Sequence, residues 1–146
     1  MAQDEKAPRS GGIEQALGFH LAQAQGSSSR HFAEIAAPLG LTQKQVFALW
    51  LVADHPGISQ IDLGQRLQMD RATTMGVVNR LQARGLIRRE KSSSDGRKQA
   101  LHLDPAGEAA IAAARLAVRD HENWLASRFT AAELGILTDL LARLHQ

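Results

Sequence analysis

The sequence predicts a mainly α-helical protein with one small β-hairpin, and three observations support this fold class. Apolar residues recur at helical spacing over most of the 146 residues, and aromatic residues make up only 4% of the chain. Side chains that cap helix N-termini precede most of the expected helices. Between residues 86 and 103 the apolar period changes to two, the period of a β-strand. With 44% apolar and 22% charged residues, the chain has the composition of a folded domain.

The expected elements follow one another closely along the chain. After a polar tail over residues 1–12, a long helix runs from 13 to 37, and Gly26 followed by a run of serines predicts a bend or a close packing contact in its middle. Three further helices, strands over 86–91 and 98–103, and two final helices come next. Their expected starts are the capping boxes Thr42/Gln45, Ser59/Asp62 and Thr130/Glu133 and the N-caps Asp70 and Asp104. Gly85 is placed to end the helix that begins after Asp70.

The helix that begins after Asp70 and the hairpin that follows it carry the functional signal. A short helix, a tight break and a second helix can present that second helix to the DNA major groove. Its outward face is expected to carry Arg71, Ala72, Met75, Gly76, Asn79 and Arg80. Six basic residues against two acidic ones lie between Arg84 and Lys98. This excess indicates a phosphate-binding hairpin, although a solvated surface loop would have the same charges.

Together these segments resemble the MarR family, the multiple-antibiotic-resistance regulators, from residue 41 to about residue 111. The matching stretches are LTQKQ at 41–45, PGISQIDL at 56–63, DRATT at 70–74, RLQARGLIRR at 80–89, DGR at 95–97 and LHLDPAG at 101–107. The most specific of them is the Asp-x-Arg of the hairpin. Where the family often has Thr-Arg in its recognition helix, this chain has Met75 and Gly76.

The resemblance implies a winged helix-turn-helix fold in a single domain, residues 13–146. Residues 41–104 would form the DNA-binding lobe, and residues 13–40 and 105–146 a helical dimerisation region; an intrachain helix pair is the alternative for the apolar stripes of the terminal helices. By the same likeness Arg97 enters the minor groove at the wing tip and Asp95 orients it, with a simple turn ion pair as the alternative. The residues expected to contact DNA are Ser59, Gln60, Arg71, Thr73, Thr74, Met75, Asn79, Arg80, Arg88, Lys91, Asp95, Arg97 and Lys98.

Members of this family commonly bind aromatic or amphipathic small molecules between the dimerisation helices and the DNA-binding lobe. The candidate lining residues in this chain are Phe19, His20, Arg30, His31, Phe47, Trp50, His121 and Trp124. Arg30 and His31 would supply a cation for an acidic ligand. The resemblance favours a hydroxycinnamate-type acid or its coenzyme A thioester, and ordinary core or surface positions are the alternative for each side chain.

The sequence also argues against several other functions. Without cysteine it forms no disulfide and no thiolate redox sensor. His20 and His31 are too far apart on one helix to hold one ion together, so no metal site and no cofactor are expected. No nucleophile elbow or phosphate loop of an enzyme is present. We therefore expect a cytoplasmic, homodimeric repressor that binds a pseudo-palindromic operator and responds to a small molecule. The alternatives are a ligand-independent architectural DNA-binding protein and an enzyme that turns over a pocket ligand.

Overall fold

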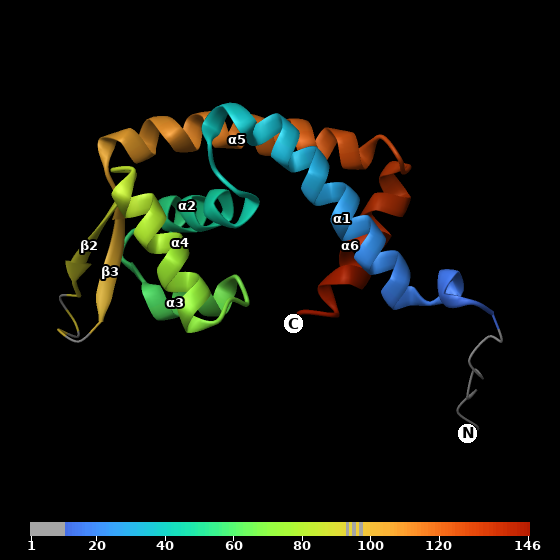
Figure 1. Ribbon diagram of the computed structural model, residues 1–146, viewed down its shortest axis with the longest axis horizontal. Helices are drawn as coiled ribbons and strands as arrows, with labels where there is room; N and C mark the ends of the chain where they lie inside the picture. Colours follow the sequence, from blue (N-terminus) through green and yellow to red (C-terminus); the bar gives the residue numbers. More distant parts are fainter. Residues whose placement is uncertain (1–10, 93, 95, 97) are drawn as a thin grey trace, which may run out of the picture.

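The computed structural model describes residues 11–92, 94, 96 and 98–146 and shows a winged-helix lobe joined to a helical arm (Figure 1). In chain order the elements are η1 (Ile13–Gln15), α1 (Leu17–Ala36), η2 (Ala37–Leu39), α2 (Gln43–Asp54), β1 (Ile58–Ser59), α3 (Gln60–Arg66), α4 (Arg71–Ala83), β2 (Ile87–Lys91), β3 (Gln99–Leu103), α5 (Pro105–Ala126) and α6 (Ala131–Ala142). The lobe contains α2, α3, α4 and the strands, whereas α1 and α6 extend toward the other end of α5 (Figure 1). The mainly helical fold class with a β wing is confirmed.

The wing is a small antiparallel sheet with the strand order β1-β3-β2. The predicted hairpin is confirmed: β2 pairs with β3, with Ile87 opposite Leu103. The sheet has a further strand that the sequence did not predict, because the short β1 pairs Ile58 with Leu101 on the other side of β3. This pairing fixes the wing to the residues that begin α3.

The core of the lobe forms where α2, α3, α4 and the sheet meet. Leu49, Leu63, Leu81 and Leu101 come from these four elements, and each side chain is fully buried. Phe32 of α1 joins the same cluster, so the arm and the lobe share one core. Full burial of a side chain of this size contributes about 1.5–3 kcal/mol to the free energy of folding, so the core holds the surface residues of the lobe in fixed positions.

The helix caps agree with the sequence except at two places: the predicted box at Ser59/Asp62 is only half formed, since only the Ser59 side chain makes its bond, and Asp104 makes no side-chain cap. Complete capping boxes are present at Thr42/Gln45 and Thr130/Glu133, and the side chains of Ser59 and Asp70 accept from the backbone N–H three residues ahead. Gly85 has a φ of 69°, the left-handed conformation expected of a residue that ends a helix. The predicted side-chain cap at Asp104 is wrong. Its carboxylate instead accepts from Arg88 Nη1 at 3.2 Å, because the wing brings that guanidinium to the start of α5.

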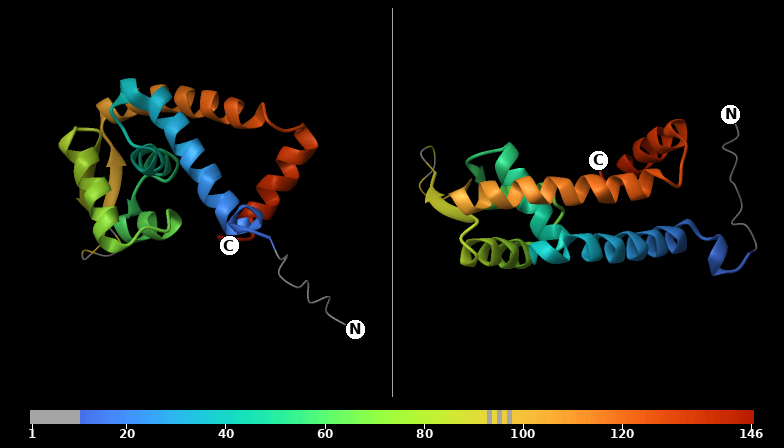
Figure 2. Two further views of the ribbon diagram at one scale, coloured as in Figure 1. Left: turned by 45° about the vertical axis from the view of Figure 1, so that its right-hand side comes forward. Right: turned by 90° about the horizontal axis from the view of Figure 1, so that it is seen from above.

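The long helix α1 is unbroken through Gly26 and the serines after it, so the predicted bend is absent from this helix. The alternative, a close packing contact, is confirmed. Ser28 Oγ lies 3.0 Å from His121 Nε2 of α5, where the two helices run side by side. Figure 2 shows α1 and α5 crossing near the lobe and α6 turning back from the far end of α5. No residue of α6 is buried in the chain.

Within the described residues, no single helix is long and apolar enough to cross a membrane. One bent pair, Leu17–Leu39 with Gln43–Asp54, meets the test on length and composition alone.

Candidate nucleic-acid interface

One face of helix α4 packs against the lobe, and the opposite face is exposed to solvent. Asp70 begins it: the Thr73 backbone N–H donates to Asp70 Oδ1 at 2.7 Å, and this bond holds the pKa of the Asp70 carboxyl below its ordinary value. Thr74, Val77, Val78 and Leu81 are buried against the lobe. The opposite face is exposed and carries the predicted residues Arg71, Ala72, Met75, Gly76, Asn79 and Arg80. The side chains of this face are therefore available to a partner while the helix itself is fixed.

Thr74 does not fit the DNA contact expected of it. Its side chain is only 3% exposed, and its hydroxyl donates to the Asp70 carbonyl at 2.7 Å. A Cβ placed on the buried Gly64 of α3 would lie 2.5 Å from Thr74 Oγ1, so α3 packs closely against α4 at this point. Thr74 belongs to the inward face because it is three residues before Val77. Its neighbour Thr73 is half-buried.

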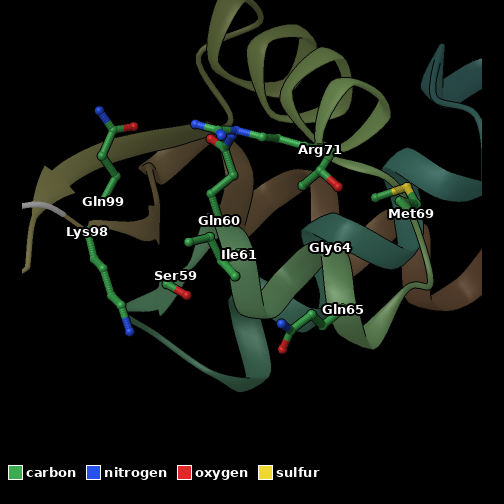
Figure 3. A pocket seen from close by; sticks show the side chains of 10 residues that line it. Ser59, Gln60, Ile61, Gly64, Gln65, Met69, Arg71, Lys98 and Gln99 are labelled. Atoms are coloured by element: carbon green, nitrogen blue, oxygen red, sulfur yellow. The ribbon is translucent and has the colours of Figure 1, made fainter.

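A hollow of about 550 Å³ lies between α3, α4 and the wing (Figure 3). It gathers several of the predicted DNA contacts: its lining includes Ser59, Gln60, Arg71, Thr74 and Lys98. Arg71 extends from the start of α4 toward Gln60, and Lys98 comes from the wing (Figure 3). Two cations and an amide from three different elements thus line one surface hollow, as recognition of an anionic, hydrogen-bonding partner requires.

Part of the basic segment is used within the chain itself. Arg84 donates to the carbonyls of Gly40 and Leu39 at 2.9 and 3.0 Å and joins the end of α4 to the loop before α2. Arg88 donates to Glu90 at 2.7 Å and to Asp104, and these bonds raise the pKa of Arg88 and lower that of Glu90. Lys91 and Lys98 are exposed on the wing. The predicted contacts Asp95 and Arg97 lie outside the described residues.

Arg89 is a central residue of this surface that the sequence reasoning missed. It extends from β2 toward both helices and donates to Gln60 of α3 and to Asn79 and Gln82 of α4. The bond from Nη2 to Asn79 Oδ1 measures 2.7 Å. Arg89 therefore connects the wing, α3 and α4 through one guanidinium. A run of consecutive arginines on a strand signals that alternate side chains face opposite ways, and this signal could have separated Arg89 from Arg88.

A second set of predicted residues meets where α1 lies against α5. The rings of His31 and Trp124 stack with centroids 4.0 Å apart and an angle of 10° between their planes. His121 stacks on both rings and is only 3% exposed. Burial, and then the charge of His31, lower the pKa of the His121 imidazole. Arg128 lies 3.9 Å from the centroid of the Trp124 ring and places a cation beside the stack.

Phe47 and Trp50 of α2 line a separate hollow of about 520 Å³ with Arg66 at its edge. Arg115 of α5 lies 5.3 Å from the centre of the Trp50 ring. Phe32, which was not among the candidate lining residues, packs edge-on against both Phe47 and His121. It thereby links this hollow to the histidine and tryptophan stack. Phe32 and His121 are buried, so the hollow at Trp50 and the stack at Trp124 are joined through the core between arm and lobe.

The remaining candidates for the ligand site lie elsewhere. Phe19 and His20 pack edge-on near the start of α1, and His20 Nε2 is 2.6 Å from the Glu14 carbonyl oxygen. At 1.5 Å per residue this pair is about 17 Å from His31 along the helix. Arg30 is exposed and donates to Ser27 Oγ at 3.2 Å. The cations near the aromatic rings are therefore Arg66, Arg115 and Arg128. The only sequence pattern that indicated one of these contacts is the i, i+4 spacing of Trp124 and Arg128.

Comparison with known proteins decides the class of this molecule. The MarR family pattern matches residues 39–98. A transcriptional regulatory protein for the hcr operon of Thauera aromatica is 37% identical over 131 residues, which is 89% of this chain and 79% of that protein. The chain belongs to the MarR family. It is accordingly a DNA-binding transcriptional regulator and not an enzyme.

Other MarR relatives agree with this assignment. The homoprotocatechuate degradative operon repressor of Escherichia coli is 28% identical over 125 residues, 86% of this chain and 84% of that protein. The transcriptional repressor CouR, solved on a 23-mer DNA duplex, superposes with a TM-score of 0.87 at 29% identity over 95% of this chain and 99% of CouR. A structure of CouR from Rhodococcus jostii RHA1 bound to p-coumaroyl-CoA shares the fold, with a TM-score of 0.82 at 20% identity over 90% of this chain and 93% of that chain. The winged helix-turn-helix fold is thus that of the MarR family.

Proposed function

We propose that this MarR protein is a dimeric repressor that binds a two-fold-symmetric operator and leaves it when a small aromatic acid, or the coenzyme A thioester of one, is bound. The observation that carries the proposal is the exposed face of α4 beside the basic wing. Arg71 and Asn79 on that face and Lys98 beside it are cations or amides, the groups that contact phosphates and base edges. The opposite face of α4 is fixed in the core, so the exposed side chains are presented in a defined geometry.

The dimer is supported by the apolar surface of the arm. Helix α6 buries no residue within the chain, yet it and the residues on either side of it expose large apolar side chains: Phe129, Ile136, Leu140, Leu141 and Leu144. Ile13 and Leu17 at the start of the chain are each 69% exposed. Apolar patches of this kind mark interaction surfaces. A second copy seated there would place two recognition helices on one side of the molecule, as a two-fold operator needs.

The effector is proposed to bind between arm and lobe, on the aromatic surface of α1, α2 and α5. The stacked rings of His31 and Trp124 would hold an aryl group, and Arg66 or Arg115 near Trp50 would hold a carboxylate or a phosphate of the thioester. The names of the E. coli and Rhodococcus relatives support an aromatic acid or its thioester. Release follows if the ligand prefers a conformer with a different separation of the two lobes, since a ligand shifts an equilibrium only by its differential affinity.

Fluorescence anisotropy tests this function. Wild type, Arg71→Ala and Arg97→Ala are titrated into DNA from upstream of the protein's own gene at two salt concentrations, against scrambled competitor. Arg119→Ala, on the exposed side of α5, is the matched control. We expect specific, salt-sensitive binding that weakens in both test variants by about 1–3 kcal/mol and is unchanged in the control. Binding without preference over scrambled DNA, repeated with a random-sequence library, would instead indicate an architectural DNA-binding protein.

The same assay tests the proposed effector. 4-Hydroxycinnamate and its coenzyme A thioester are added to the preformed complex, and we expect at least one of them to raise the dissociation constant. Equal DNA affinity at saturating concentrations of both compounds would contradict release by this class of ligand.

A further inference from the structure

The hydrogen bonds of Arg89 use most of what a guanidinium can donate. Nε and Nη2 both donate to Gln60 Oε1, at 3.3 and 3.2 Å, Nη2 also donates to Asn79 Oδ1 at 2.7 Å, and Nη1 donates to Gln82 Oε1. The Arg89 guanidinium, which has five N–H donors, thus donates four hydrogen bonds. All of the acceptors are side-chain amide oxygens, and they come from α3 and α4. Arg89 itself is half-buried between them.

This arrangement fixes the polarity of the three amides. A side-chain amide carries an acceptor oxygen at one end and a donor NH2 group at the other, and either end can face a partner. A guanidinium has no acceptor, so it can be met only by the oxygen. Each of Gln60, Asn79 and Gln82 must therefore turn its oxygen toward Arg89 and its NH2 group away from it. Asn79 and Gln82 are exposed, so their NH2 groups face outward.

We propose that Arg89 is a positioning residue that sets the base preference of the recognition helix, by turning the Asn79 oxygen toward itself and the Asn79 NH2 group toward DNA. The proposal rests on the proposed function, because it concerns the same DNA-binding face. An asparagine that reads adenine must offer its oxygen to N6 and its NH2 to N7. An asparagine whose oxygen is turned toward Arg89 points its NH2 group, and not both ends of the amide, at the base. Its NH2 group suits a base edge made of acceptors alone, and guanine presents two of these side by side, O6 and N7.

The experiment is selection of operators from a random DNA library, followed by affinity measurements on single-base variants, for wild type, Asn79→Ala, Arg89→Lys and Arg89→Met. We expect the wild type to prefer guanine over adenine at one base pair of each half-site and Asn79→Ala to lose that preference. Arg89→Lys keeps the charge but not the planar fork of donors. We expect both Arg89 variants to lower the guanine-to-adenine ratio at the same base pair by about tenfold, the size of one good base contact.

Two controls separate the positioning role of Arg89 from general effects of charge and of folding. Arg84→Lys changes another arginine of the basic segment, whose bonds go to the Gly40 and Leu39 carbonyls, and it is expected to leave every base preference unchanged. The readout is the ratio of the affinities for guanine and adenine at one base pair. A general loss of folded protein lowers both affinities equally and leaves this ratio unchanged. An unchanged guanine preference in both Arg89 variants, with a specific wild type, would overturn this inference and leave the proposed function standing. A wild type that selects no sequence would overturn both.

Discussion

The Nδ1 atoms of His31 and His121 lie 2.9 Å apart, so the two imidazoles share one hydrogen at that contact. One Nδ1 donates and the other accepts. His121 Nε2 completes the arrangement with Ser28 Oγ at 3.0 Å, as acceptor or donor according to the tautomer. Protonation of both rings would place two N–H groups face to face at this contact. The contact between α1 and α5 therefore depends on the protonation of this pair.

The first prediction concerns stability below neutral pH. Burial, and then the charge of His31, lower the pKa of His121, while Glu122 opposes the shift. Since the folded-state pKa lies below the ordinary value of about 6.5, the unfolded chain binds more protons between those two values. Stability is then lost as the pH falls below about 6.5 toward the folded-state pKa. Thermal unfolding midpoints between pH 8 and pH 5 measure this loss, and we expect it to be smaller in His121→Gln than in wild type.

His145→Gln is the control for this experiment, because His145 is exposed at the C-terminus. It is expected to follow the wild-type pH dependence. A His121→Gln protein that loses as much stability as wild type over the same range would show that other groups dominate the acid response.

The second prediction concerns the junction of α5 with the wing. A Cβ on the buried Gly107 would lie 2.0 Å from the Leu86 carbonyl oxygen, which already accepts from the Asp104 N–H at 3.0 Å. A backbone oxygen cannot move aside as a flexible side chain does. We expect Gly107→Ala to destabilise the protein by about 1–3 kcal/mol in denaturant unfolding, the usual cost of overpacking.

Gly135→Ala is the matched control for that substitution. Gly135 is also helical, and a Cβ there meets nothing within 4 Å. Because alanine is favoured over glycine in a helix by about 1 kcal/mol, this variant is expected to be equally or more stable. A Gly107→Ala protein as stable as Gly135→Ala would contradict the close approach of α5 to residue 86.

The third prediction concerns oligomeric state. Leu140 and Leu144 are 47% and 64% exposed on α6 and its C-terminal end. If a second copy covers them, Leu140→Glu with Leu144→Glu buries charges at the interface, and the protein should run as a monomer of 15.8 kDa in light scattering after gel filtration. Ile61→Glu, an equally exposed apolar position on α3, should retain the wild-type mass. A wild type that is itself monomeric would contradict the proposed dimer.

The sequence predicts those features of this fold that depend on local chemistry. The capping boxes at Thr42 and Thr130 are set by side chains three residues apart, so their pattern is visible in the chain. The exposed face of α4 follows from helical periodicity in the same way. β1 was not predictable, because a two-residue strand is defined only by its pairing with β3.

The parts of the site that the sequence reasoning missed depend on contacts between distant segments. Arg89 meets Gln60 from a position 29 residues away, and Arg88 reaches Asp104 across 16 residues and replaces its predicted cap. In the ligand site, the stack of His31 on His121 is formed by residues 90 apart. The helical rise already placed Phe19 and His20 about 17 Å from His31, but periodicity could not show which residues of α5 meet His31.

The last prediction concerns Met75, which is 49% exposed on the outward face of α4 beside Gly76. A thioether side chain among donors suits an apolar partner, and the C5-methyl of thymine is the apolar group of the major groove. Replacing thymine by deoxyuracil at one operator position removes only that methyl. At the contacted position we expect wild-type affinity to fall about fourfold, the value of about 0.8 kcal/mol for one buried methylene-sized group. Met75→Ala should bind both DNAs alike, whereas an equal uracil penalty in Met75→Ala and wild type would assign the methyl contact to another side chain.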